Sequence, residues 1–274
     1  MTDSQATRTL SNGTAIPVVG LGVWQVSDGP ETERAVTWAL ETGYRLIDTA
    51  QAYRNEASVG RAIRDSGIPR EEIFLTTKFY PGGKDARVEA EKSLQRLGTD
   101  YLDLYLIHWP YPGQDTYVET WQTLEELYAD GRVRSIGVSN FQPAHLQRLL
   151  DETGTVPAIN QVELHPWLQQ TELREFHAEH GIVTEAWSPI SRGAKPDDPA
   201  IGRLADKHGT TPAQVILRWH LDIGNVIIPK SVNPERMAAN LDLFGFQLDD
   251  DDHAVITGLD EGTRIGPNPD QFGA

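Results

Sequence analysis

The sequence predicts an α/β protein: a (β/α)8 TIM barrel with an N-terminal β-hairpin and two extra helices. Short apolar segments of strand length alternate with longer amphipathic segments along the chain. This alternation indicates parallel strands joined by right-handed helical crossovers. Eight strand segments suit a closed barrel better than an open sheet. The length of 274 residues also fits one barrel, which usually needs roughly 250 residues.

The expected elements follow in a regular order. A turn sequence at residues 11–14 indicates a hairpin before the first barrel strand. The expected strands cover residues 18–22, 45–48, 73–78, 101–108, 133–139, 158–163, 182–187 and 226–229. The helical patterns between them include residues 31–42, 85–97, 116–130, 144–152 and 172–180.

Additional helices depart from strict alternation. Two are expected between the seventh and eighth strands, at residues 199–208 and 212–222, and two after the eighth, at residues 234–242 and 250–259. Pro212 and Pro234 each stand where a first-turn proline is tolerated. The four consecutive aspartates at residues 249–252 predict a helix start, because carboxylates stabilise the positive end of a helix. No Pro- or Gly-rich linker divides the chain, so residues 1–274 are expected to form a single domain.

Composition excludes several classes of protein. The formal net charge of −16 argues against nucleic-acid binding, because phosphates would be repelled over most of the surface. The chain has no cysteine, which excludes disulfides, thiol nucleophiles and thiolate metal sites. No apolar run approaches the roughly 18 residues that cross a bilayer, and the polar N-terminus lacks the features of a secretion signal. A cytoplasmic protein without membrane contact is expected.

Polar side chains stand at the carboxyl ends of successive predicted strands. The βα loops of a parallel barrel meet there around one mouth, where functional groups collect. The strand-end residues are Asp48, Lys78, His108, Ser139, Asn140, Gln161, Trp187, Ser188, Lys230 and Ser231. One such residue would mean little, because a lone histidine or lysine is more often structural, but a ring of them in register with the strands predicts a site.

Four residues of this region form a plausible proton-transfer group. Tyr53 lies five residues beyond Asp48, on the loop after the second strand. A free tyrosine, with a pKa of about 10, is a poor acid at neutral pH. The ammonium of Lys78 should lower that pKa, and the carboxylate of Asp48 should hold the ammonium in place. Tyr53 could then protonate a carbonyl oxygen that His108 orients by hydrogen bonding, without a metal ion.

Three long segments of the chain resemble the aldo-keto reductase family. They are Gly43-Tyr-Arg-Leu-Ile-Asp-Thr-Ala-Gln-Ala-Tyr-Arg-Asn-Glu-Ala-Ser-Val-Gly60, Leu97-Gly-Thr-Asp-Tyr-Leu-Asp-Leu-Tyr-Leu-Ile-His-Trp-Pro110 and Ile228-Pro-Lys-Ser-Val-Asn-Pro-Glu-Arg-Met-Ala-Ala-Asn240. The likeness covers residues 10–272 and is greatest to the bacterial 2,5-diketo-D-gluconate reductase group. It implies an NADPH-dependent carbonyl oxidoreductase with Asp48, Tyr53, Lys78 and His108 as catalytic residues and Tyr53 as proton donor.

The resemblance also implies how NADPH is bound without a Rossmann motif. Trp187 matches the aromatic residue that stacks on the nicotinamide, and Ser139, Asn140 and Gln161 match the groups that hold its carboxamide. The residues matched to the 2′-phosphate and adenine are Lys230, Ser231, Arg236 and Asn240, and further cofactor contacts are expected from Gly22, Val23, Ser188, Ile190 and Val232. Ala239 stands where many members carry an acidic residue, so part of the adenine contact is expected to be missing.

The expected substrate is a small carbonyl compound, such as an aldehyde or a dicarbonyl, including 2,5-diketo-D-gluconate. Trp24, Tyr80 and Trp109 are expected to form an aromatic wall of the pocket, although a buried tryptophan is also ordinary packing. The loop after Lys78 and the tail at residues 263–274 line the family's pocket and vary widely. Family habit favours a monomer.

Other classes of function fit the sequence less well. Gly20-Leu-Gly22 lacks the third glycine of a Rossmann fingerprint. The eight histidines form none of the paired motifs of a metal-dependent hydrolase, and Gly137-Val-Ser-Asn140 lacks the second glycine of a nucleophile elbow. The remaining alternative is a cofactor-binding regulatory or sensing subunit with little turnover, because fold alone does not fix function.

Overall fold

A computed structural model describes residues 6–195 and 197–273 of the chain. Residues 1–5, on which part of the argument about a secretion signal depends, lie outside the described residues, as do Pro196 and the last residue of the expected tail, Ala274. No helix in the described ranges is long and apolar enough to cross a membrane.

Eight parallel strands form the central sheet, in the sequential order β3 to β10. They are β3 (Leu21–Gly22), β4 (Leu46–Asp48), β5 (Phe74–Phe79), β6 (Leu104–Ile107), β7 (Ile136–Ser139), β8 (Ile159–Glu163), β9 (Val183–Trp187) and β10 (Val226–Ile227). The first and last strands meet through a parallel bridge between Val19 and Ile227 and a hydrogen bond from the Ile227 amide to the Val18 carbonyl. This contact closes the sheet, which confirms the predicted (β/α)8 barrel.

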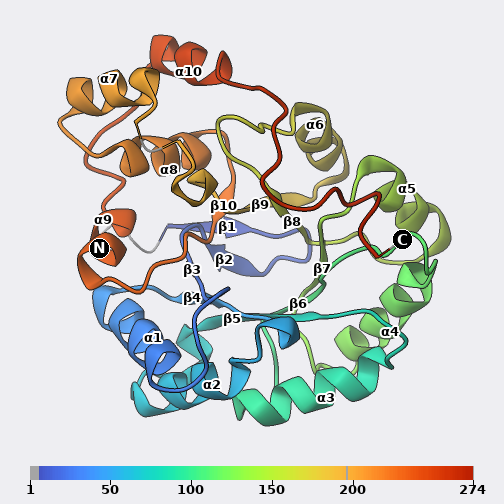
Figure 1. Ribbon diagram of the computed structural model, residues 1–274. Coiled ribbons are helices and arrows are strands. Elements are labelled where there is room, and N and C mark those ends of the chain that lie inside the picture. Colours follow the sequence, from blue (N-terminus) through green and yellow to red (C-terminus); the bar gives the residue numbers. More distant parts are fainter. Residues whose placement is uncertain (1–5, 196, 274) are drawn as a thin grey trace.

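Helices surround the strands, as Figure 1 shows. They are α1 (Pro30–Thr42), α2 (Glu56–Asp65), α3 (Ala86–Leu97), α4 (Tyr117–Ala129), α5 (Pro143–Glu152), α6 (Thr171–His180), α7 (Pro199–His208), α8 (Pro212–Asp222), α9 (Pro234–Leu241) and α10 (Asp250–Thr257). The two extra helices between the last strands are present as α7 and α8, and the aspartate run does begin a helix. The Asp249 side chain caps α10 by accepting from the Asp252 amide.

Helix α2 is an element that the sequence analysis missed. Its central residue is Gly60, and glycine lowers helix propensity by about 1 kcal/mol relative to alanine. A Cβ atom at Gly60 would lie 2.2 Å from the Leu97 carbonyl oxygen at the end of α3. The glycine therefore permits close packing of two helices, which a local pattern does not show.

The hairpin closes the amino-terminal end of the barrel. Strands β1 (Thr7–Thr9) and β2 (Ala15–Pro17) pair antiparallel, and they lie across the middle of the helix ring in Figure 1. Leu10 and Ile16 are buried in a cluster with apolar side chains from six of the barrel strands. Because alternate residues of a strand point to opposite faces, this cluster forms the barrel interior. Polar side chains occupy the opposite, carboxyl end.

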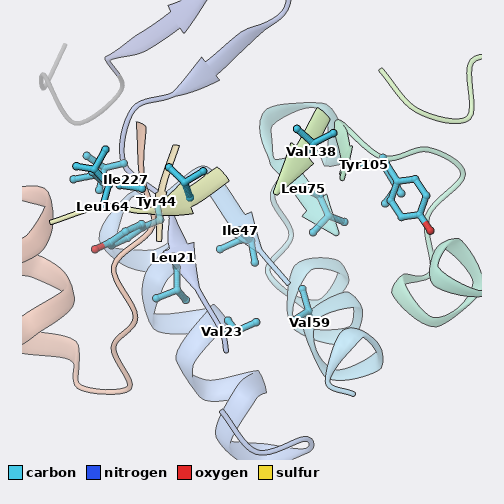
Figure 2. Packing of buried hydrophobic residues seen from close by; sticks show 14 of the residues in the cluster. Leu21, Val23, Tyr44, Ile47, Val59, Leu75, Tyr105, Val138, Leu164 and Ile227 are labelled. Carbon is cyan, nitrogen blue, oxygen red and sulfur yellow. The ribbon is translucent and has the colours of Figure 1, made fainter. Parts of the chain in front are cut away.

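A larger apolar layer lies between the strands and the helices. Figure 2 shows part of this layer, with Leu21, Ile47 and Leu75 on strands and Val59 on α2. Several observed strands are shorter than the predicted apolar segments; residues 101–108, for example, contain β6 at Leu104–Ile107. Leu102, ahead of β6, is buried and pairs through an isolated parallel bridge to Val133.

Candidate active site at the carboxyl end of the barrel

Eight of the ten predicted strand-end residues line one cleft of about 590 Å³, and Lys78 and Ser231 lie outside its lining. The residues of that set that line it are Asp48, His108, Ser139, Asn140, Gln161, Trp187, Ser188 and Lys230. Parallel strands place these positions at one end of the barrel because their carboxyl ends all point the same way. Tyr53 reaches the cleft from a 3₁₀ turn, Gln51–Tyr53, that directly follows β4.

Lys78 is the centre of a buried polar group in the cleft floor. Its Nζ donates to Asp48 Oδ1 at 2.5 Å, to the Thr49 carbonyl at 3.0 Å and to the Tyr53 hydroxyl at 3.4 Å. These three contacts use all three hydrogens of the ammonium. Lys78 is fully buried, so the contacts replace the water that a buried charge would otherwise lack.

The pKa values in this group follow from burial and from the ion pair. Burial disfavours the Lys78 ammonium, but Asp48 more than offsets it, so the pKa of Lys78 is raised. Burial also raises the pKa of Tyr53, to about 12, although Lys78 acts in the opposite direction. The ammonium lowers the phenol pKa, as the sequence predicts, but in this structure desolvation outweighs its effect. Tyr53 is therefore a neutral phenol at physiological pH.

His108 lies beside this group, immediately after β6. Its ring meets the Tyr53 ring edge to face, with centroids 5.5 Å apart. Burial, with a smaller contribution from the Lys78 ammonium, holds the pKa of His108 well below its usual range. The imidazole is therefore neutral and can donate one hydrogen bond. Its Nδ1 has no partner among the described residues.

A row of hydrogen bonds crosses the opposite wall of the cleft. Ser139 Oγ donates to the Gln161 carbonyl at 2.8 Å, and Asn140 Nδ2 donates to Ser139 Oγ at 3.1 Å. Trp187 Nε1 donates to Asn140 Oδ1 at 2.8 Å. Asn140 has a φ of 64°, a conformation that asparagine tolerates better than most residues. The row fixes the Trp187 ring, which is half-buried and lines the cleft.

The other residues expected to contact a cofactor divide into two sets. Gly22, Ile190 and Arg236 line the cleft with Lys230 and Ser188, whereas Val23, Ser231, Val232 and Asn240 do not. Gly22 permits a close approach of two chain segments, because a Cβ there would lie 2.8 Å from the Ile228 backbone carbonyl oxygen. Val23 is fully buried in the apolar layer. The Ser231 hydroxyl accepts from the Asn233 amide, next to the start of α9.

The three predicted aromatic wall residues all line the cleft. Tyr80 meets the His108 ring edge to face at 5.8 Å, and Trp109 stacks on Phe272 with centroids 4.1 Å apart. The tail is expected from the sequence to line the pocket, but Phe272 is not singled out by its sequence pattern. The same holds for Arg192, whose guanidinium lies over the Trp24 ring at 4.4 Å. Arg192 lies in a short 3₁₀ turn, Ser191–Gly193, and Phe272 in the tail; neither segment has a periodicity that indicates which side chain faces the cleft.

Glu163, at the end of β8, binds the chain that leads to Phe272. Its carboxylate accepts from the amides of Ile265 at 2.6 Å and Gly266 at 2.9 Å, and His165 Nε2 lies 3.2 Å away. A Cβ at Gly266 would lie 2.5 Å from the Trp187 ring. The tail is therefore held directly against the cleft wall.

The fold and this strand-end site define a barrel with a tyrosine, lysine, aspartate and histidine at its mouth. Residues 18–261 match the model of the aldo/keto reductase family. The chain belongs to that family. An aldo-keto reductase of Mycolicibacterium smegmatis is 57% identical over 96% of this chain and 97% of its own length. Methylglyoxal reductase DkgA of Escherichia coli K12 is 52% identical over the same shares of the two chains.

Solved structures agree with this assignment. A variant of Gox0644, solved in complex with NADPH, superimposes with a TM-score of 0.91 at 48% identity, covering 97% of this chain and 98% of the other.

In the described part of this chain, no group of three or more histidine, aspartate or glutamate residues could hold a metal ion.

Proposed function

We propose that this chain reduces aldehydes or ketones with NADPH and that Tyr53 donates the proton to the carbonyl oxygen. The observation that carries the proposal is the buried Lys78–Asp48 pair, which contacts the Tyr53 hydroxyl at the floor of an aromatic-walled cleft. A charged pair in the barrel interior costs desolvation free energy. Its contact with the hydroxyl of Tyr53, whose ring packs against His108, gives it a chemical use.

The cleft has groups that fit NADPH. Lys230 and Arg236 are exposed at one end of it, and neither forms an ion pair within residues 6–195 and 197–273. Together they would hold the 2′-phosphate, which Arg can bind in a forked geometry. Ser139 and Gln161 would bind the nicotinamide carboxamide, with the Trp187 ring beside it. When bound, NADPH supplies the hydride.

The chain's own residues would supply the proton and orient the substrate. Tyr53 is protonated at neutral pH, as a general acid must be. Once its proton has moved to the carbonyl oxygen, the phenolate faces the Lys78 ammonium at a hydroxyl–nitrogen distance of 3.4 Å. Neutral His108 can donate a hydrogen bond to the same oxygen and so stabilise the developing negative charge.

The proposed substrate class is small carbonyl compounds, including α-dicarbonyls such as methylglyoxal and sugar-derived dicarbonyls such as 2,5-diketo-D-gluconate. Trp24, Tyr80, Trp109 and Phe272 give the cleft an apolar wall, and Arg192 adds a cation beside Trp24. The name of the E. coli relative supports methylglyoxal as a first substrate to test. A panel of aldehydes, ketones and dicarbonyls ranked by kcat/KM would identify the preferred one.

We also propose that residues 1–274 form one domain that acts as a monomer. A single apolar layer joins the strands to helices from both halves of the chain, which supports one cooperative unit. Size-exclusion chromatography with light scattering should give the 30.4 kDa mass of one chain; a mass of about twice this value would contradict the monomer.

Replacing Tyr53 with phenylalanine tests the reaction. The Tyr53→Phe change removes the proton donor and retains the ring, so carbonyl reduction should fall by about 10²–10⁴-fold while NADPH still binds. NADPH oxidation and fluorescence titration measure the two properties. Turnover near that of the unchanged protein would refute the assignment of Tyr53. Binding of NADPH with no reduction of any carbonyl by the unchanged protein would favour a regulatory subunit instead.

A further inference from the structure

A second carboxyl group, Glu185, lies in the barrel interior beside the proposed catalytic residues. Glu185 is fully buried on β9, two residues before Trp187 on the same face of the strand. It is paired in register with Gln161 on β8. Its Oε2 accepts from Gln161 Nε2 at 2.8 Å, and its Oε1 has no partner among the described residues.

Gln161 links Glu185 to Asp48. The same Gln161 Nε2 donates to Asp48 Oδ2 at 2.9 Å, so both of its hydrogens are used by carboxyl groups. A rotated amide would place its carbonyl oxygen against those two groups. The side-chain orientation of Gln161, which lines the cleft, is therefore fixed by Asp48 on one side and Glu185 on the other.

The charges in this interior do not balance if both carboxyls are ionised. The Lys78 ammonium lies 2.5 Å from Asp48, and Glu185 forms no ion pair with any residue that the structure describes. Burial, together with the nearby Asp48 carboxylate, raises the pKa of Glu185 to about 8. Glu185 is therefore protonated at neutral pH and ionises a little above it, which adds one negative charge to the cleft floor.

We infer that Glu185 is a positioning residue whose ionisation shifts the cofactor preference of the cleft from NADPH towards NADP⁺. This inference rests on the proposed function. The nicotinamide ring of NADP⁺ is cationic and that of NADPH is neutral, so a carboxylate behind Gln161 attracts only the oxidised ring. When Glu185 is neutral, Asp48 is the carboxylate that remains near the ring, and the Lys78 ammonium already neutralises its charge.

The ionisable groups that face Glu185 leave it as the carboxyl that titrates. Burial raises the pKa of Asp48 as well, but the Lys78 ammonium 2.5 Å from Asp48 favours the ionised form of that carboxyl, so Glu185 is the one that keeps its proton. Asp48 on β4, Lys78 on β5 and Tyr53 on the 3₁₀ turn are the ionisable groups that interact with it. Tyr53 has its pKa raised to about 12 and that of Lys78 is raised, so both stay protonated. The other flanking strand, β10, presents Val226 beside it. The 2′-phosphate is common to both nucleotides, so its effect cancels in a ratio of dissociation constants.

The test is the ratio Kd(NADP⁺)/Kd(NADPH), measured by fluorescence titration or calorimetry between pH 6.5 and 9.5. The ratio should fall by about tenfold as Glu185 ionises, since a nearby buried charge interacts strongly with a cationic ring. The Glu185→Gln variant is isosteric and cannot ionise, so its ratio should not change with pH. Glu56→Gln is the matched control: Glu56 is also buried, but it pairs with Arg96 outside the cleft, so the variant should keep the fall.

A measurement on the unchanged protein keeps the inference testable if the variant does not fold. Calorimetry at pH 8 in buffers of different ionisation enthalpy should show that NADP⁺ binding releases more protons than NADPH binding. A constant ratio, equal proton release, or a pH-dependent ratio in Glu185→Gln would each overturn the role of Glu185 and leave the reductase proposal standing. Failure of both nucleotides to bind the unchanged protein would overturn the proposed function as well.

Discussion

At the residue scale, the site depends on how a few side chains divide their hydrogen bonds. Lys78 gives one hydrogen each to Asp48, Thr49 and Tyr53, and Gln161 gives both of its hydrogens to carboxyl groups. Buried polar groups with every donor satisfied are rigid, because any rearrangement leaves one unpaired at a cost of about 1–3 kcal/mol. The cleft floor is therefore preorganised by the protein itself.

Arg236 is the residue whose proposed role is most easily separated from the rest of the site. It is exposed on α9 and is expected to bind the 2′-phosphate that NADH lacks. Arg236→Ala should weaken NADPH about 10- to 100-fold, since a charge-assisted hydrogen bond contributes about 1.5–3 kcal/mol, and should leave NADH nearly unchanged. Fluorescence titration measures both constants. Arg64→Ala, on the exposed face of α2, is the control and should change neither; equal losses for both nucleotides in Arg236→Ala would contradict the assignment.

At the element scale, most of the architecture could be predicted from the sequence because each strand and helix has its own pattern of apolar residues. The helices at residues 199–208 and 212–222 begin with proline after a capping residue, and their predicted bounds match the structure. Helix α2 was missed because its glycine is explained only by the approach of α3. Local pattern predicts an element, whereas a close contact between two elements depends on the whole fold.

In the site, too, single residues could be predicted from local pattern, whereas contacts between distant residues could not. Asp48, Lys78 and His108 could be predicted because each ends a recognisable strand. Glu185 could have been placed inside the barrel from its even spacing to Trp187. Its proximity to Asp48, however, arises because the sheet is closed, which brings the carboxyls of β4 and β9 within reach of one glutamine of β8. The sequence spacing of 137 residues between the two carboxyls carries no sign of this contact.

Two helical glycines test the packing argument for α2. Gly60→Ala should destabilise the protein by about 1–3 kcal/mol, because the added methyl group would lie 2.2 Å from the Leu97 carbonyl oxygen. Gly202→Ala, in α7, meets nothing within 4 Å and should stabilise by up to about 1 kcal/mol, since alanine is the better helix former. Urea denaturation measures both free energies of unfolding. The same sign for both variants would refute the role assigned to Gly60.

At the scale of the whole molecule, the two ends of the barrel have different tasks. The amino-terminal end is sealed by the hairpin, whose Leu10 and Ile16 complete an apolar interior. The carboxyl end carries the polar groups and is bordered by the tail that Glu163 holds. An apolar interior below a polar mouth separates stability from chemistry, as is usual for this fold. Substitutions at the two ends should therefore affect different measurements.

Ile16 tests this separation from the side of stability. Ile16→Ala removes a fully buried side chain and should lower the free energy of unfolding by about 2–5 kcal/mol, the range for such cavities. The change lies at the opposite end of the barrel from the cleft, so the dissociation constant of NADPH, measured under conditions where the variant is folded, should stay within about twofold. Thr9→Ala, on the exposed face of the same hairpin, should alter stability by no more than about 0.5 kcal/mol. A large loss of NADPH affinity in folded Ile16→Ala would show that the hairpin and the cleft are coupled through the interior, which would contradict the separation.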